Sequence, residues 1–238
     1  MHDCLPQNTN AITTLTLEQA EVLISKGEYV LLNGLQTLSK EVAGAFGNID
    51  DWRTIQLDGL ITLPRDVAAA LAMYRGGLSL GGLITVSFDV AQALAEHEGG
   101  LSLNGVTSLT PKAAQTLAEH GGDLSLNGLT KLSPKLAEAL ARHCGWLPAD
   151  GVEDDDDEAE LDTEWELSLN GLRTLTPTTA AALGKHRGSL RLDGLTSLSL
   201  KAAIGLVKHE GVLSLKRLAK PSRQVAEVLS GNDDIWIG

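Results

Sequence analysis

The chain has 238 residues, of which 43% are hydrophobic and only 3% aromatic. This is enough apolar material for one large core or two modest domains. A core built almost entirely from Leu, Val, Ile and Ala favours one small packing unit that is used many times. The formal net charge is −12, and no basic surface of the kind that binds nucleic acid is evident, so we expect no nucleic-acid partner.

Cysteine content and apolar runs exclude two further classes. Cys4 and Cys144 are too few for a disulfide framework and lack the spacing of a metal site. No run of about 18 apolar residues occurs, so we expect no membrane span. Residues 1–10 contain no basic region followed by an apolar core, which indicates no signal peptide and a cytoplasmic protein.

Taken in chain order, the sequence begins with a polar lead over residues 1–11, which we expect to be flexible. A helix is predicted over residues 16–26, without a preceding strand, as a cap on the N-terminal end of the fold. Residues 12–238 are predicted to form one continuous domain, which is interrupted only by an acidic insertion at about residues 145–166.

A six-residue pattern recurs from residue 30 onward: apolar, variable, apolar, polar, Gly, apolar, with small departures in some units. Each unit is predicted to begin with a short strand, because buried and exposed positions alternate. The spacing is mostly 23 residues, with 25 at the first step and 43 at the insertion. The units start at Val30, Ile55, Leu78, Leu101, Leu124, Leu167, Leu190 and Leu213, with a last partial unit at Ile235.

A short helix is predicted about nine residues after each strand starts. Thr110-Pro111, Ser133-Pro134 and Thr176-Pro177 place a hydroxyl at the N-cap and Pro at the first helical position. We expect a glycine after the last turn to adopt the left-handed conformation that often ends a helix. The glycines at this place are Gly99, Gly121, Gly145, Gly188 and Gly211.

One such strand and helix cannot bury their apolar faces alone, whereas stacked units can, at about 1.5–3 kcal/mol per buried Leu. Parallel strands lie about 4.8 Å apart and helices about 8–10 Å apart, so the stack must bend. We predict an α/β solenoid with parallel strands on the concave side and short helices on the convex side. The Asn-Gly pairs leave one alternative open, in which each unit is a small hairpin followed by a helix.

The pattern Leu-x-Leu-x-Gly-Leu-Thr-x-Leu-(Ser/Thr)-Pro-x-x-Ala-x-x-Leu resembles the leucine-rich repeat family and is most similar to bacterial variants with a 23-residue repeat. It departs from the common pattern because the polar residue follows Leu-x-Leu directly, as at Asn104, Asn127 and Asn170. The resemblance therefore does not by itself imply the usual buried asparagine ladder. The resemblance implies a leucine-rich-repeat solenoid and a protein-interaction scaffold, which most often binds through the concave face or an inserted loop.

Strand positions that point away from the core form two columns, which are candidate partner-binding surfaces. The first concave column comprises Gln56, Ser79, Ser102, Ser125, Ser168, Arg191 and Ser214, and the second concave column comprises Asp58, Gly81, Asn104, Asn127, Asn170, Asp193 and Lys216. Alternatively, the Asn and Asp side chains bond the backbone of the following turn. The middle of this face lacks the Tyr, Trp and Arg anchors of strong interfaces, so we expect weak or polar ligands.

Five of the six histidines share one repeat position: His97, His120, His143, His186 and His209. Such a column suggests a metal site. However, a helix spacing of about 8–10 Å exceeds what one ion bridges at about 2.0–2.1 Å per nitrogen. We therefore predict no metal and no cofactor, with each imidazole bonding free carbonyls at a helix end and favouring the negative end of the helix dipole.

Residues 77–81, Gly-Leu-Ser-Leu-Gly, match the nucleophile elbow of serine hydrolases. That elbow needs a strained turn between a strand and a helix. Ser79 is instead predicted to lie in the middle of a strand, like Ser102 and Ser125. We therefore predict that the protein is not an enzyme.

The acidic insertion is the least repeat-like segment. Residues 144–166 contain eleven Asp or Glu and no Lys or Arg, so they hold almost all of the net charge; the dense part includes Asp154, Asp155, Asp156, Asp157 and Glu158. Three interpretations are open: a solvated loop, a docking arm for a basic protein, and a calcium site, although the spacing of an EF-hand loop is absent. Trp146 and Trp165 flank the run and could anchor it.

The last predicted element is an apolar edge strand formed by Ile235, Trp236 and Ile237, with no evident cap. Bare strand edges invite pairing, which suggests an end-to-end homo-oligomer. The sequence thus favours a non-enzymatic protein-binding scaffold that uses the concave face, the acidic loop or both. The alternative is a structural or assembly module that self-associates through this edge strand.

Overall fold

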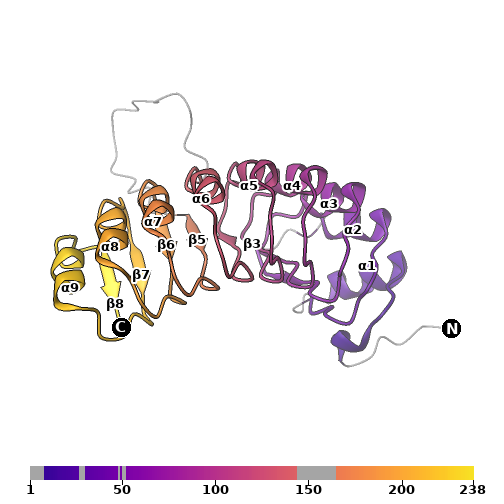
Figure 1. Ribbon diagram of the computed structural model, residues 1–238. Coiled ribbons are helices and arrows are strands. Elements are labelled where there is room, and N and C mark those ends of the chain that lie inside the picture. Colours follow the sequence, from indigo (N-terminus) through magenta and orange to yellow (C-terminus); the bar gives the residue numbers. More distant parts are fainter. Residues whose placement is uncertain (1–7, 27–29, 48, 50–51, 144–164) are drawn as a thin grey trace, which may run out of the picture.

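The computed structural model describes residues 8–26, 30–47, 49, 52–143 and 165–238. Its repeating strand–helix units form a curved array, with strands along the inner side and helices along the outer side (Figure 1). Eight strands form a single sheet in chain order, each parallel to its neighbours. The strands are β1 (Ile55–Gln56), β2 (Leu78–Ser79), β3 (Leu101–Ser102), β4 (Leu124–Ser125), β5 (Glu166–Ser168), β6 (Ser189–Arg191), β7 (Leu213–Leu215) and β8 (Ile235–Ile237).

The helices are short and pack against their neighbours along the chain. A 3-10 helix, η1 (Thr9–Ala11), comes first, and Thr9 donates a 2.7 Å hydrogen bond to the Leu31 carbonyl of the first unit. The α-helices are α1 (Leu17–Ser25), α2 (Lys40–Phe46), α3 (Arg65–Leu71), α4 (Phe88–Ala95), α5 (Pro111–Leu117), α6 (Pro134–Leu140), α7 (Pro177–Leu183), α8 (Leu200–Leu206) and α9 (Arg223–Leu229).

The strand register follows the repeat. Leu78 pairs with Leu101, and Leu101 pairs with Leu124, so each Leu-x-Leu lies beside its equivalent. The pairing continues across the insertion, because Leu124 pairs with Leu167. These parallel pairs confirm the predicted solenoid, and the alternative of one hairpin per unit is wrong. The Asn-Gly pairs do form tight turns, but the chain then runs on to a helix instead of returning antiparallel.

The core runs along the solenoid between the sheet and the helices. Leu101, Leu103 and Val106 from one unit are buried, together with Ala114 and Leu117 from the next helix. A continuous interior made from such small contributions explains why so few aromatic residues are needed. No helix in the described ranges is long and apolar enough to cross a membrane.

The structure confirms the predicted N-caps of the helices, but it confirms the predicted left-handed glycines after the helices only in part. The side chains of Thr110, Ser133 and Thr176 each accept a hydrogen bond from the third residue of their helix, with Pro at the first position. A left-handed glycine was expected after each helix. Gly188 and Gly211 adopt it, with φ of 99° and 100°, whereas the other described glycines have no positive φ.

The prediction of a left-handed glycine is therefore wrong for Gly99 and Gly121, and Gly145 lies outside the described residues. At Gly99 the need for glycine is steric, because a Cβ there would lie 2.1 Å from the Gly76 carbonyl oxygen. The same holds for the turn glycines of the units, of which only the unit starting at Leu213 has another residue, Arg217: at Gly194 a Cβ would lie 1.9 Å from the Asn170 carbonyl oxygen. Close approach of successive turns thus fixes glycine at these places.

Candidate functional site

The second concave column forms a ladder of hydrogen bonds between units. Asn104 Oδ1 accepts from the Asn127 N–H at 3.0 Å, and Asn127 Oδ1 accepts from the Asn170 N–H at 2.7 Å. Asn170 Oδ1 accepts in turn from the Asp193 N–H at 2.7 Å. The sequence predicted that each Asn side chain bonds the turn that follows it in its own unit. Each side chain instead bonds the backbone N–H of the equivalent residue in the next unit, which the parallel register of the strands places beside it.

The serines of the first concave column complete this ladder. Ser125 Oγ donates to Asn104 Oδ1 at 2.7 Å and lies 2.9 Å from Asn127 Nδ2, which donates to it. Ser168 makes the same two contacts with Asn127 and Asn170, at 3.0 and 3.1 Å. Most hydrogen-bonding capacity in the middle of the face is thus used within the protein, which leaves little for a partner.

The N-terminal part of the face has the same construction. Gln56 Oε1 accepts from Asn33 Nδ2 at 3.1 Å, and the Asp58 N–H donates to Asn33 Oδ1 at 3.1 Å. Asp58 Oδ1 accepts from the Ser79 hydroxyl at 2.6 Å. Ser79 therefore lies in β2 as a member of the ladder, and the elbow-like sequence around it contains no turn into a helix.

The C-terminal part of the face is charged. Arg191 lies between two carboxylates: its Nε is 3.3 Å from Asp193 Oδ2, and its Nη1 is 3.4 Å from Glu166 Oε1. Burial raises the pKa of Glu166, although Arg191 opposes this shift. Burial alone would raise the pKa of Asp193 too, but hydrogen bonds from Ser214, the Lys216 N–H and Arg191 outweigh it and lower that pKa. The negative charge of Glu166 raises the pKa of Arg191.

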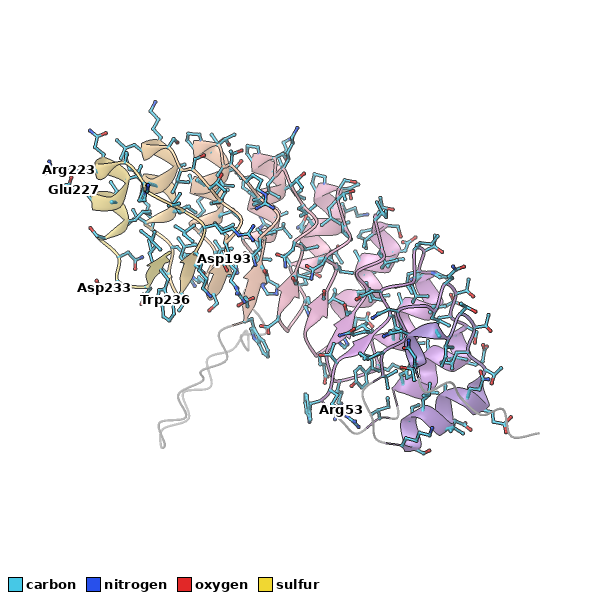
Figure 2. All side chains as sticks on the ribbon, turned by 90° about the horizontal axis from the view of Figure 1, so that it is seen from below. Arg53, Asp193, Arg223, Glu227, Asp233 and Trp236 are labelled. Atoms are coloured by element: carbon cyan, nitrogen blue, oxygen red, sulfur yellow. The ribbon has the colours of Figure 1, made fainter. Side chains whose placement is uncertain are left out.

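Trp236 lies on this same face. It pairs with Ser214, which pairs in β6 with Arg191, so Trp236 extends the first concave column by one position. Its side chain is 60% exposed, and Figure 2 shows Trp236 and Asp193 on the strand side, with Arg223 and Glu227 on α9 at the end of the array. The sequence analysis assigned Trp236 only to the C-terminal edge strand and missed its place in the first concave column. That place follows once Ile235 is aligned with Leu213, because Trp236 then aligns with Ser214.

Charged residues beside these positions add acidity. Asp123 and Asp234, one position before the Leu-x-Leu pattern in their units, are exposed. Asp123 Oδ1 accepts from the Glu166 N–H at 2.8 Å. We call Asp123, Glu166, Arg191, Asp193 and Trp236 the C-terminal concave patch. It combines an exposed aromatic ring, one arginine and three carboxylates.

The five histidines form a buried row of stacked rings behind the sheet. Successive ring centroids lie 5.6–6.4 Å apart, and each side chain is at most 3% exposed. The rings are therefore closer than the helix spacing used to argue against a metal. Among the described residues, however, no three His, Cys, Asp or Glu side chains are grouped so that they could hold a metal ion.

Burial lowers the pKa of His97 and His143. Burial and the charge of neighbouring imidazoles lower the pKa of His120 and His186 to about 3. A lowered pKa favours the neutral imidazole, so the expected attraction to the negative end of a helix dipole is weakened for these four. His143 Nε2 instead lies 2.9 Å from the Gly122 carbonyl oxygen, in the loop of the previous unit.

Residues that replace histidine in the row make the same kind of contact. Tyr74, one unit before His97, donates from its hydroxyl to the Arg53 carbonyl at 2.5 Å. Asn232, one unit after His209, donates to the carbonyls of Val207 and His209 at 3.1 Å each. At Tyr74, His143 and Asn232 this position thus links the loops of successive units by a hydrogen bond. Within the described part of the chain, the rings of His97, His120 and His186 are buried without such a bond to their ring nitrogens.

The acidic residues Asp154, Asp155, Asp156, Asp157 and Glu158 lie outside the described residues, as does Trp146. The described ranges end at His143 and resume at Trp165. The proposed docking arm and calcium site therefore remain predictions from the sequence.

Similarity of this chain to known proteins is weak. No family model and no curated protein matches the chain. A solved structure of a leucine-rich repeat protein from Leptospira interrogans is similar over 95% of this chain and 77% of that chain, at 15% sequence identity and a TM-score of 0.25. The assignment to a leucine-rich-repeat type of solenoid therefore rests on the repeated parallel units themselves.

Proposed function

We propose that the protein is a non-enzymatic scaffold that binds a protein partner on its concave face, mainly through the C-terminal concave patch. The observation that carries this proposal is the contrast along the face. The middle is a row of Ser and Asn whose polar groups bond one another, whereas the C-terminal end presents Trp236 and Arg191. Trp and Arg are the residue types that most often dominate binding energy at interfaces.

The charge of the patch favours a basic partner. Two carboxylates, Glu166 and Asp193, pair with the Arg191 guanidinium, and Asp123 and Asp234 add exposed negative charge. Arg191 and Trp236 lie two strands apart, which corresponds to about 10 Å between their backbones. One partner segment can span that distance, placing an apolar group on Trp236 and a cation beside Glu166 or Asp193.

The acidic insertion is a second surface for the same partner. Its charge would accelerate association with a basic protein within a Debye length of about 8 Å. Because β4 and β5 pair directly, the insertion can act as an appendage that leaves the sheet intact. Under this proposal Asp154 to Asp157 and Glu158 steer the partner, and the patch holds it.

The test is affinity capture from the source lysate, followed by calorimetric titration of the captured protein. Arg191→Ala and Trp236→Ala are each expected to weaken binding at least tenfold. Trp52→Ala is the matched control, because Trp52 is 75% exposed but lies outside the patch. A fourth variant carries a short Gly-Ser link in place of residues 151–164, and this change should lower the association rate more than it raises the dissociation rate. Unchanged affinity in both patch variants would refute the proposal.

Assembly through β8 is a second candidate function. Trp236 is 60% and Ile237 38% exposed, and no strand in the described part of the chain pairs with the outer side of β8. Ile235, Trp236 and Ile237 could then pair with a second copy. Sedimentation at rising concentration tests this: association that Ile237→Lys abolishes would favour assembly, and a constant monomer mass would exclude it.

A further inference from the structure

The ladder of the second concave column has one interruption. From Asn10 to Lys216 there are eight steps between units, and at seven of them a side-chain oxygen accepts from the backbone N–H one unit later, at 2.7–3.1 Å. The exception is Asn104, because the preceding unit has Gly81 at this position. The Asn104 N–H has no acceptor among the described residues.

The first concave column is interrupted at the same place. Four serines donate their hydroxyl hydrogen to the ladder residue of the previous unit, at 2.5–3.0 Å: Ser79, Ser125, Ser168 and Ser214. Ser102 accepts from Asn104 Nδ2 at 2.8 Å, but Gly81 offers its hydroxyl no side-chain oxygen. Two donors, the Asn104 N–H and the Ser102 hydroxyl, therefore border the place of one missing side chain.

The opposite border of this gap is an acceptor. Asp58 Oδ1 accepts from the Ser79 hydroxyl and from the Gly81 N–H, at 2.6 and 2.7 Å. A Cβ built on Gly81 would lie 2.9 Å from that oxygen, so the carboxylate adjoins the gap. Gly81 and the neighbouring Gly100 lack side chains, and a Cβ on Gly100 would meet only the Asp123 side chain, at 3.7 Å. A ligand can therefore come close to the backbone at these two places.

The gap has two hydrogen-bond donors on one side and the Asp58 carboxylate on the other, so it favours a ligand group that both accepts and donates hydrogen bonds. A carboxamide has an oxygen for the Asn104 N–H and the Ser102 hydroxyl, and an NH₂ group for Ser79 Oγ and the Asp58 carboxylate. A ligand carboxylate would meet Asp58 with like charge, and an apolar group would leave the donors without acceptors. Two exposed apolar side chains lie three residues after Asp58 and Gly81 in the chain: Ile61 and Ile84 are 67% and 56% exposed.

We propose that the gap at Gly81 is a subsite for the side-chain carboxamide of Asn or Gln, supplied by an extended segment of a protein partner that completes the ladder. This inference deepens the proposed protein-binding function and rests on it. Residues of the same segment beside the carboxamide contact Ile61 and Ile84. Arg191 and Trp236 lie in β6 and β8, four and six strands along the sheet from β2, so the subsite and these two residues are separable by experiment.

The test uses the full chain and three blocked amino acids as probes, followed by ¹H–¹⁵N NMR. N-acetyl-asparagine N-methylamide is expected to shift the Asn104 amide signal with saturation. The aspartate analogue should bind at least tenfold more weakly, and the leucine analogue should leave that signal unchanged. Equal responses to the three probes, or no response to the asparagine probe, would overturn the subsite.

Two substitutions check the location. Gly81→Asn should supply the missing side chain, abolish the probe response and slow hydrogen exchange of the Asn104 amide at least tenfold. Gly81→Ala should also abolish the response but leave that exchange rate unchanged, because a methyl group offers no acceptor. Lys216→Ala, in the same column but far from the gap, is the control that keeps the response.

A response that persists in Gly81→Asn would place the probe elsewhere and contradict the subsite. Failure of these probe experiments leaves the binding tests on Arg191 and Trp236 unaffected. Conversely, unchanged partner binding in those variants would refute the patch without altering the probe result at Gly81.

Discussion

Asn127 and Asn170 are hydrogen-bonded across the acidic insertion: Asn127 Oδ1 accepts from the Asn170 N–H at 2.7 Å, although 43 residues separate them in the chain. Leu124 and Leu167 are paired in the sheet beside them. The units on either side of the insertion therefore pair with each other in the same way as any two consecutive units.

Shortening the insertion should consequently leave stability nearly unchanged. Replacing residues 151–164 with a short Gly-Ser link is expected to alter the free energy of unfolding by less than about 1 kcal/mol, because loop-closure entropy changes slowly with loop length. Urea unfolding followed by circular dichroism measures this. A loss of several kcal/mol would show that the insertion contributes packing to the fold.

The histidine row predicts acid sensitivity. For His120 and His186 the folded-state pKa is about 3, below the ordinary value of about 6.5, so the unfolded chain binds more protons as the pH falls. Their stabilising effect is fully present above pH 6.5 and is lost progressively as the pH falls from there toward 3. Each should contribute a slope of up to about 1.4 kcal/mol per pH unit.

Unfolding by urea between pH 7.5 and 5.0 tests this before most carboxylates titrate. The His120→Leu variant should show a shallower dependence than the native chain, because one titrating group has been removed from the interior. Identical slopes in the two chains would contradict the assignment of His120 as a neutral buried base.

Asn232 should be important for the attachment of the last unit. Its Nδ2 donates to the carbonyls of Val207 and His209 at 3.1 Å each, so Asn232→Ala leaves two partly buried carbonyls without that donor. A cost of about 1–3 kcal/mol is expected. Asn232→His, which restores the residue type of the row, should recover part of it. Thermal unfolding compares the two variants, and an unchanged midpoint in Asn232→Ala would refute the role.

Arg191 should control the protonation of Glu166. Burial already raises the pKa of Glu166, and the guanidinium opposes that shift, so Arg191→Met is expected to raise this pKa further. Because the folded-state value then lies above the unfolded one, the variant should gain stability as the pH falls through the raised pKa. Carbon-detected NMR titration of the Glu166 carboxylate measures the shift, and a lower pKa in the variant would contradict it.

Sequence periodicity was sufficient to predict the strands, the helices and their parallel stacking, since Leu-x-Leu and the Ser/Thr-Pro caps are local signals repeated in step. The ladder partner of Asn104 was not predicted, because a side-chain bond to the next unit depends on register that only the stacked fold defines. Ring stacking in the histidine row was missed for a related reason. Side chains that converge from neighbouring helix ends lie closer together than the helix axes.

The turn glycines, as at Gly194 against the Asn170 carbonyl, bring successive turns into close backbone contact at each step except at Arg217, which replaces the glycine in the unit that starts at Leu213. The solenoid can therefore grow or shrink only by whole units, since a partial unit would break this contact. Gain or loss of one unit moves the Gly81 gap and the C-terminal concave patch apart or together by one strand spacing, about 4.8 Å. The distance between two binding points on a partner is thereby adjustable by duplication or deletion of a 23-residue segment, with no change to either point.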